Sequence, residues 1–317
     1  MATTLLTMGV GGSAHAQPLL ESLRVYCGAA AGSTPDIVAR LVAEQLTGRY
    51  AKRCIVENRP GAAGRIAVNA LKAAPADGST MLLGGIGISA LNPLLYATLG
   101  YDPNVDLRPV SLAAEMSLAL AVGPAVPDSV KTTSGLIEWM RRNPALANIG
   151  SPGVGTLPHL SESMFFRAAD VAWVHVPYSG GAPVVTSLLG GQIAALILPE
   201  AVLNPHRAAG KLRVLATSGS QRSRLMPEVA SFVEQGYPEL SVMEWFAFYM
   251  SGEVPQTTID LASQSVRDAT AQPELVRAFA ALGMTAASST PTELTTRIAA
   301  EKRVWERVIR DAEIRVQ

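Results

Sequence analysis

The sequence predicts an α/β protein with mostly parallel sheets, and three observations lead to this fold class. Short apolar runs alternate with longer amphipathic segments along most of the chain. Loops rich in Gly, Ala, Ser and Pro join the apolar runs to the amphipathic segments that follow them. The 317 residues are also enough for two domains. Strands that alternate with helices pair in parallel, because each helix returns the chain to the same end of the sheet.

The first part of the chain has the clearest alternation. Apolar runs predict strands at 23–27, 54–58 and 80–84. Amphipathic segments between them predict helices at 35–47 and 64–74. Two more apolar runs follow, at 109–114 and 117–122.

A second alternation begins with a predicted helix at 133–142. The strands predicted after it lie at 147–150, 171–176, 193–198 and 212–217, with helices between them. The segment 242–250 is too apolar and aromatic for a loop. The remaining segments are predicted helices at 255–271, 273–282 and 291–312.

The loop at 28–36 has the composition of an anion site. Its side chains are small up to Thr34, so a ligand can approach the backbone closely. Thr34 is a suitable N-cap, Pro35 suits the first helical position and Asp36 suits the first turn. The free N–H groups of such a first turn attract an anion. An ordinary tight turn from strand to helix is the alternative interpretation.

Repetition of this design favours a site. The segments at 61–64, 150–159 and 177–183 are also small-residue loops that follow a strand-like run and open a helix. Several such loops at the carboxyl ends of strands predict a crevice lined by helix N-termini. A crevice of this kind suits a small anion with more than one charged end.

Composition excludes several classes of partner. Lys plus Arg equals Asp plus Glu at 26 each, so no basic surplus favours nucleic acid or an anionic membrane. No His or Cys spacing resembles a zinc site, and we expect neither a metal nor a cofactor. Cys27 and Cys54 fall at opposite ends of neighbouring parallel strands, too far apart for a disulfide, so both should be free.

Residues 1–16 resemble a shortened export signal. A short apolar segment precedes Ala14-His15-Ala16, which fits the small-x-small cleavage pattern before Gln17. The usual basic start is missing, so the alternative is that the segment is not a signal. No later apolar run approaches the roughly 18 residues that a membrane helix needs. We therefore expect a soluble, periplasmic mature chain.

Ten stretches, taken in their order and spacing, resemble the substrate-binding proteins of tripartite tricarboxylate transporters, the TctC or Bug family. The resemblance runs from about residue 22 to the end. The matching stretches lie at 32–40 (GSTPDIVAR), 56–64 (VENRPGAAG), 76–84 (ADGSTMLLG), 92–96 (NPLLY), 101–103 (YDP), 150–160 (GSPGVGTLPHL), 175–180 (HVPYSG), 188–192 (LLGGQ), 209–213 (AGKLR) and 245–246 (WF).

The resemblance implies a two-lobed periplasmic-binding-protein fold of type II, often called a Venus flytrap. Lobe 1 would comprise 17–121 plus 246–317, and lobe 2 would comprise 122–245. The chain would cross between the lobes at about 120–124 and near 240–246. The family implies capture of a small organic acid, a monomer, and transporter membrane subunits as partners, for uptake or sensing.

The resemblance also implies the ligand-binding residues. The loop from Ala31 to Asp36 would hold one carboxylate and the helix that opens at Thr156 would hold another. Some relatives carry an Asp near the end of a later strand, where this chain has Leu198-Pro199, which disfavours an amino-acid ligand. The full set of candidate residues is Ala31, Gly32, Ser33, Thr34, Asp36, Gly85, Ile86, Ser151, Gly155, Thr156, His159 and Tyr178.

Three of these candidates have a structural alternative. Asp36 could orient the loop or a bridging water, or it could simply stabilise the helix dipole. His159 could donate to a ligand carboxylate, although a lone histidine is more often structural. The phenol of Tyr178 could reach the crevice or lie half-buried at its rim.

The competing function is a nicotinamide-dependent oxidoreductase. Gly85-Ile86-Gly87-Ile88-Ser89-Ala90 fits the pattern G-x-G-x-x-A after a strand. The pattern follows the third strand rather than the first, and Asn92-Pro93 interrupts the helix that should bind the pyrophosphate. A serine hydrolase is disfavoured because no G-x-S-x-G occurs. A regulator's sensing domain would share the fold, but nothing resembles a DNA-binding helix-turn-helix.

Overall fold

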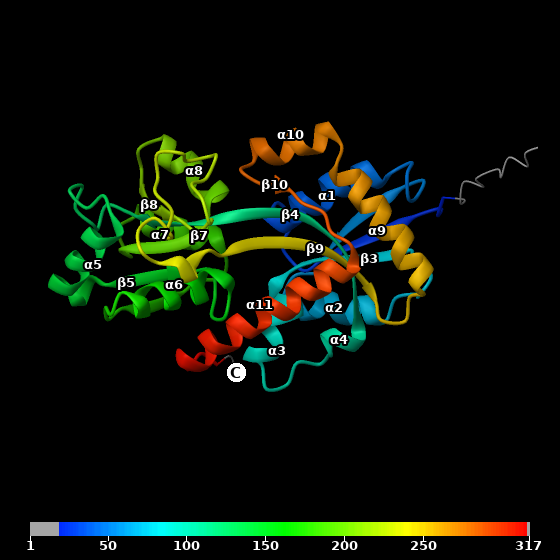
Figure 1. Ribbon diagram of the computed structural model, residues 1–317, viewed down its shortest axis with the longest axis horizontal. Coiled ribbons are helices and arrows are strands. Elements are labelled where there is room, and N and C mark those ends of the chain that lie inside the picture. Colours follow the sequence, from blue (N-terminus) through cyan, green and yellow to red (C-terminus); the bar gives the residue numbers. More distant parts are fainter. Residues whose placement is uncertain (1–18, 316–317) are drawn as a thin grey trace, which may run out of the picture.

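The protein has two lobes joined by two long strands (Figure 1). The computed structural model describes residues 19–315. The joining strands are β4, Leu107–Val122, and β9, Met243–Ser251. The expected signal segment 1–16 and its cleavage site before Gln17 lie outside the described residues. No helix within 19–315 is long and apolar enough to cross a membrane.

The first lobe is built on three parallel strands. β1, Leu23–Cys27, pairs with both β2, Cys54–Asn58, and β3, Thr80–Gly85. All three lie at the predicted positions. The helices α1, Thr34–Leu46, and α2, Arg65–Lys72, connect them and pack against different core clusters.

The second lobe repeats this parallel pattern. β5, Asn148–Ser151, pairs in parallel with β6, Val174–Pro177, and with β7, Ala195–Pro199. β8, Arg213–Thr217, pairs with β4. The helices of this lobe are α5 (Thr133–Arg142), α6 (Leu157–Ala168), α7 (Gly181–Leu189) and α8 (Glu200–Ala208).

The long strand β4 changes partners between the lobes. Its residues up to Ser117 pair with β9, and its residues from Leu118 pair with β7 or β8. The two apolar runs expected at 109–114 and 117–122 are therefore one continuous strand. Glu115 interrupts the apolar pattern, but in the structure it pairs with Arg297 far along the chain. All pairings of β4 and β9 are antiparallel, so the ten-stranded sheet is mixed rather than mostly parallel.

The C-terminal segment returns to the first lobe. It comprises α9, Gln256–Thr270, α10, Pro273–Ala281, the short strand β10, Thr285–Ala286, and α11, Pro291–Asp311. Thr290 and Glu293 form a capping box that starts α11. Figure 1 shows α11 running beneath β9 with its last turns near α6 of the second lobe.

Short helical turns complete the described chain. They are η1 (Ala62–Gly64), η2 (Gly87–Leu91), α3 (Asn92–Leu95), α4 (Pro103–Asp106), η3 (Pro144–Leu146) and η4 (Pro238–Leu240).

The carboxyl ends of the parallel strands in one lobe face the carboxyl ends of the parallel strands in the other lobe. β9 is antiparallel to both β3 and β4, so β4 runs in the same direction as β3 and β1, towards the second lobe. β7 is antiparallel to β4 and parallel to β5, so β5 runs back towards the first lobe. The loops that follow β1 and β5 therefore lie on the facing ends of the lobes.

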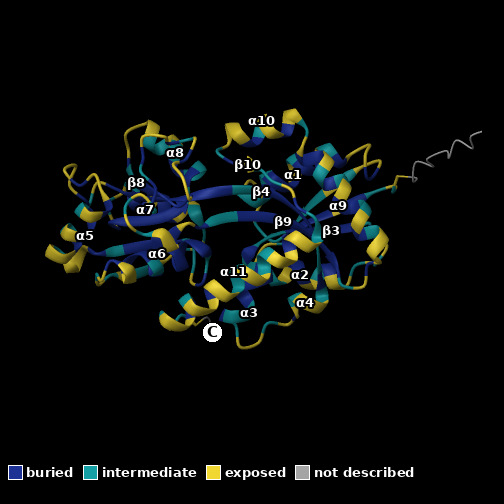
Figure 2. Ribbon diagram, in the orientation of Figure 1, coloured by how far each residue is buried: buried dark blue, intermediate teal, exposed yellow. Residues whose placement is uncertain are grey.

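The core follows the sheet through both lobes. Figure 2 shows β4, β9 and the inner faces of the helices as buried, with exposed residues on the outer helix faces. Trp245 of β9 is fully buried, and its indole N–H donates to the carboxylate of Glu301 on α11. The core is mostly aliphatic.

Both cysteines are free, as expected. In the register of β1 with β2, Cys54 pairs with Leu23 and Cys27 pairs with Asn58. The two cysteines thus lie at opposite ends of the strand pair, which is the geometry that the sequence argument assumed.

Candidate functional site

The loop after β1 opens α1 with a left-handed glycine. Gly32 has φ of 78°, a conformation that favours glycine. Ser33 is the N-cap, with extended φ and ψ, and Thr34 and Pro35 are the first two helical residues. The prediction of Thr34 as N-cap is therefore wrong by one residue, because the N-cap is Ser33 and the helix begins at Thr34.

Asp36 fixes the shape of this loop from inside. It is 2% exposed and accepts a hydrogen bond from the main-chain N–H of Gly32 at 2.8 Å. The side chains of Arg40 and Asn58 also donate to its carboxylate, at 3.0 and 2.8 Å. Burial raises the pKa of Asp36, but these hydrogen bonds outweigh burial and hold the pKa below its ordinary value. Of the two sequence interpretations, the geometry supports orientation of the loop.

The loop after β5 has the same construction. Gly155 has φ of 75°, Thr156 is an extended N-cap, and Leu157 and Pro158 are the first two residues of α6. The third helical residue, His159, accepts a hydrogen bond at Nδ1 from the main-chain N–H of Gly155, at 3.1 Å. His159 thus occupies the place that Asp36 occupies in the first lobe.

The N-cap hydroxyls complete the match between the two loops. The hydroxyl of Ser33 donates to the carbonyl of Ala30 at 2.6 Å, and that of Thr156 donates to the carbonyl of Gly153 at 2.8 Å. Each hydroxyl therefore turns back into its own loop instead of capping its helix. Asn58 of β2 supports the first loop, whereas His175 of β6 stacks on His159 in the second, with ring centroids 3.8 Å apart.

Each loop leaves backbone donors free at the start of its helix. Among the described residues, the N–H groups of Thr34 and Asp36 donate to no protein acceptor, and neither do those of Leu157 and His159. Pro35 and Pro158 have no N–H to offer. Two donors at the positive end of a helix dipole suit one carboxylate, so the two loops suit an anion with two charged ends.

The imidazole of His159 is neutral in this arrangement. Because Nδ1 accepts from Gly155, the ring proton lies on Nε2. Burial, and next the neighbouring His175, lower the pKa of His159 to about 3. Burial also lowers the pKa of His175, whose Nε2 lies 2.7 Å from the hydroxyl of Ser151. The pair therefore adds no positive charge to the second loop near neutral pH.

Four other candidate residues face inward or bond to the protein. Ser151 is fully buried and bonds to His175 and to the carbonyl of Gly153. The hydroxyl of Tyr178 bonds to Ser187 of α7. Ile86 is 3% exposed within the core, and Gly85 ends β3 beside Phe246. These residues support the loops, and their side chains offer no free polar group there.

The dinucleotide interpretation of 85–90 has no structural support. After Gly85 the chain forms the π-helical turn η2 and then the four-residue helix α3. A pyrophosphate site needs a regular helix that opens directly after its glycines.

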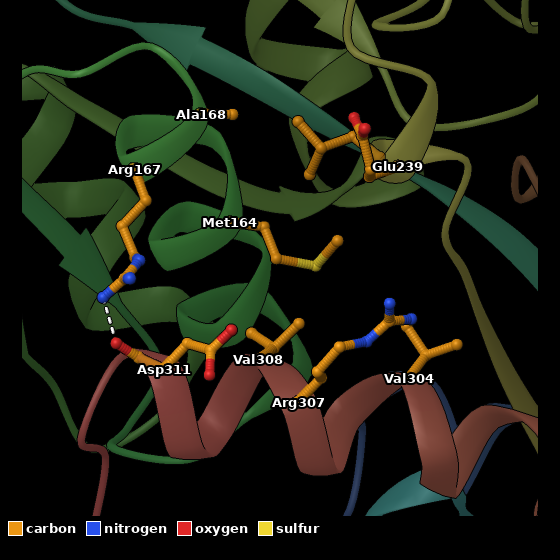
Figure 3. A pocket seen from close by; sticks show the side chains of 9 residues that line it. Met164, Arg167, Ala168, Glu239, Val304, Arg307, Val308 and Asp311 are labelled. Atoms are coloured by element: carbon orange, nitrogen blue, oxygen red, sulfur yellow. Dashed lines mark hydrogen bonds between the residues drawn. The ribbon is translucent and has the colours of Figure 1, made fainter.

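A separate cavity lies elsewhere on the molecule. It has a volume of about 240 Å³ and lies between α6, η4 and α11, with Met164, Val304 and Val308 among its lining residues (Figure 3). Arg167 donates to the main-chain carbonyl of Asp311 beside it. None of the candidate residues lines this cavity, so it is not the predicted site.

Sequence reasoning missed four residues in or near the candidate site. Asn58 and His175 support the loops from neighbouring strands, and only the register places them there. Val154 is 40% exposed at the tip of the second loop, where Ala31 lies in the first. The sequence feature that could have identified Val154 is its position between two glycines in a small-residue loop. Glu244 of β9 lies opposite Met116, next to the point where β4 changes partners.

Comparison with known proteins assigns the family. Residues 38–314 match the model of the tripartite tricarboxylate transporter family receptor, TctC. Protein BugT of Bordetella pertussis is 31% identical over 286 residues, which covers 88% of this chain and 86% of BugT.

Solved structures agree with this assignment. The structure of Rpa4515 from R. palustris with adipate is 28% identical and superposes with a TM-score of 0.85, covering 93% of this chain and 98% of that one. A structure of a periplasmic transporter is 29% identical, with a TM-score of 0.83 and the same coverage. These likenesses support a solute-binding protein and give no support to an oxidoreductase. The chain belongs to the TctC family of tripartite tricarboxylate transporter receptors.

Proposed function

We propose that this protein is a periplasmic receptor that captures a small organic acid with two or more carboxylates between its lobes. The observation that carries the proposal is the duplicated loop, with two free N–H groups at each of two helix starts on facing ends of the lobes. The adipate in the Rpa4515 structure is a ligand of this kind.

Binding by this geometry would favour closure. Each lobe supplies donors for one end of the acid, so a ligand that engages both loops stabilises the state in which the lobes are near each other. We place the lobe boundaries at 121/122 and 245/246. The strands β4 and β9 would act as the connection, since both extend across that boundary region.

In this proposal the protein captures the ligand and delivers it, and it does not catalyse a reaction of the ligand. The delivery partner would be a set of transporter membrane subunits, for uptake or sensing. We expect the receptor to act as a monomer in the periplasm, which light scattering and cell fractionation would test. Intact chain found in the cytoplasm would contradict the proposed location.

Calorimetry with a panel of acids tests the function. Succinate, glutarate, adipate and citrate are the probes, and dimethyl adipate is the matched control, because it keeps the carbon chain without the charges. We expect at least one acid to bind and the ester not to bind. Failure of every acid to bind would contradict the proposal.

A matched pair of variants tests the site. Thr34→Pro removes one of the two free N–H groups of α1, and proline suits this position because Ser33 before it is extended. Thr34→Ala keeps that N–H. Loss of one charge-assisted hydrogen bond should weaken binding about tenfold in Thr34→Pro, whereas Thr34→Ala should bind like wild type. Equal affinity in the two variants would place the acid elsewhere.

A further inference from the structure

Glu244 lies in the gap between the strand ends of the two lobes. The strands β4 and β9 cross this gap (Figure 1). On β9, the carboxyl end of β3 reaches Phe246, and on β4, the carboxyl end of β7 reaches Leu118. Glu244 pairs with Met116, between these two points. The side chain of Glu244 therefore belongs to the floor of the space between the lobes.

The helix α11 covers one face of this gap, and Glu244 points to the other face. Glu115 and Trp245 are opposite one another, so their side chains share a face, and on that face Glu115 pairs with Arg297 of α11. Residues 116 and 244 come next along each strand, so their side chains point the other way. Met116 shares a core cluster there with the inner side of α1. Glu244 therefore points to the side of the sheet on which the first loop opens α1.

The carboxylate of Glu244 has no partner in the protein. It makes no hydrogen bond or ion pair with any residue in 19–315, and it is half-buried, whereas Met116 opposite is 1% exposed. The polar groups left free at the two loops can all donate, namely main-chain N–H groups, the Nε2–H of His159 and the hydroxyl of Thr34. An ionised Glu244 would repel an organic acid bound by these donors, whereas a protonated Glu244 would add a further donor.

The ionisable groups on the neighbouring elements do not keep Glu244 ionised. On α1, Asp36 and Arg40 pair with each other, and on α6, His159 is neutral. After β7, burial raises the pKa of Glu200. The charged groups of α11 that pair with β4 lie on the opposite face. Burial raises the pKa of Glu244 to about 7, and no charge of the described residues offsets this effect.

We infer that Glu244 is a ligand-binding residue that receives the acid as a protonated carboxyl and donates its O–H to a carboxylate of the ligand. This inference rests on the proposed function, since it assumes that an organic acid enters the space between the lobes. An anion placed next to Glu244 favours the protonated form, so the protein takes up a proton from the solvent as the acid binds. The resulting hydrogen bond has an ionised acceptor, which makes it stronger than a bond between neutral groups.

Calorimetry in buffers of different ionisation enthalpy measures the proton uptake. The probes are succinate, glutarate and adipate, whose carboxyl groups are ionised from pH 6.5 upwards. At pH 8 we expect about one proton to be taken up per acid bound, and the affinity should fall at least about tenfold from pH 6.5 to pH 8.5, because a growing share of the free protein must first be protonated. Release of a proton on binding would show that an ionised Glu244 accepts from a donor on the ligand, and it would overturn the inference.

Variants assign the proton to its residue. The amide of Glu244→Gln donates like a protonated carboxyl but does not titrate, so its affinity should not change with pH and should exceed that of wild type about tenfold at pH 8.5. Glu244→Ala should also be independent of pH, but it should bind more weakly than Glu244→Gln because it has no donor. Glu200→Gln is the matched control, since Glu200 is also a glutamate whose pKa burial raises, and this variant should keep the proton uptake of wild type.

The outcomes distinguish failure of the inference from failure of the proposed function. If none of the three acids binds to wild type at pH 6.5, the proposed function fails together with the inference. If acids bind but wild type and Glu244→Gln depend on pH in the same way, or if Glu200→Gln abolishes the proton uptake, only the inference fails. Equal affinity of Glu244→Ala and Glu244→Gln would overturn the hydrogen bond to the ligand.

Discussion

The main-chain N–H of Gly155 donates to Nδ1 of His159 at 3.1 Å, and this bond fixes both the shape of the loop and the tautomer of the imidazole. The same bond joins Gly32 to Asp36 in the other lobe. The two halves of the site thus use one backbone design with chemically different acceptors.

Removal of the imidazole should destabilise the second lobe. His159→Ala leaves the N–H of Gly155 without its acceptor and removes the stacking partner of His175, so we expect a loss of about 2–4 kcal/mol in the free energy of unfolding. Urea unfolding at pH 7 measures it. His206→Ala is the control, since His206 lies on α8 and its side chain makes no hydrogen bond within 19–315. Equal effects of the two variants would contradict the prediction.

The same histidine predicts a dependence of stability on pH. The folded pKa of His159 is about 3, below the ordinary value of 6.5, so between these values the unfolded chain binds a proton that the folded chain does not. The free energy of unfolding should therefore fall as the pH is lowered from 7 to 4. His159→Ala should show a smaller fall. An equally steep fall in the variant would show that other groups cause it.

The ionised carboxylate of Asp36 should stabilise the folded state over a different pH range. Its folded pKa lies below the ordinary value of 3.8, so its contribution is full above pH 3.8 and is lost as the pH falls through the folded pKa. Asp36→Asn removes the ion pair with Arg40 and should cost about 1–3 kcal/mol at pH 7. The difference from wild type should shrink in acid, and a constant difference down to pH 2 would contradict this assignment.

Titration of Glu244 should change the free energy of unfolding with pH in the opposite direction to titration of Asp36 and His159. Burial raises its pKa to about 7 from 4.5, so the folded state keeps a proton that the unfolded chain releases. Stability should therefore fall as the pH rises from 4.5 to 7, with the full loss present above 7. Glu244→Gln should have a higher Tm than wild type at pH 8 and a similar one at pH 5. A variant that is less stable at pH 8 would contradict the assignment.

The sequence placed Tyr178 among the ligand contacts, and substitution of Tyr178 tests that prediction. Because its hydroxyl bonds to Ser187, Tyr178→Phe should lower the free energy of unfolding by about 1 kcal/mol and leave acid affinity unchanged. Tyr237→Phe is the matched control, since that hydroxyl makes no hydrogen bond in the part of the chain described. A clear loss of acid affinity in Tyr178→Phe would restore the original prediction.

The sequence could predict the elements that depend on local patterns. The strands at 23–27 and 54–58 were correct to the residue, because each is a short apolar run bounded by turn residues. The continuity of β4 could not be predicted, because Glu115 becomes acceptable within the strand only through Arg297 of α11. That partner is distant in the sequence and leaves no local signal.

For the site, the sequence predicted the loops but not the roles of their side chains. Small residues before Thr34 and Thr156 indicated both helix starts. The equivalence of Asp36 and His159 was hidden, because a carboxylate and an imidazole look unrelated until both are seen to accept from a glycine N–H. Asn58 and His175 come into place only through strand pairing.

The left-handed glycines allow a test that separates backbone strain from ligand contact. Gly32→Val and Gly155→Val force valine into φ near 75–78°, which costs roughly 1–2 kcal/mol in stability, and they place a bulky group beside the free N–H groups. We expect acid affinity, measured by calorimetry on folded variants, to fall at least tenfold.

Gly48→Val supplies the matched control. Gly48 also has φ of 78°, is exposed like Gly32, and a Cβ added at either glycine meets nothing within 4 Å. It lies after the C-terminal end of α1, away from the free donors. The strain should therefore be the same in Gly32→Val and Gly48→Val, and the two should lose similar stability. Only Gly32→Val should lose affinity. If Gly32→Val and Gly48→Val both bind acid like wild type, the loop after β1 is a turn that binds no ligand. The valine at position 32 would then have blocked the approach to the backbone without any effect on binding.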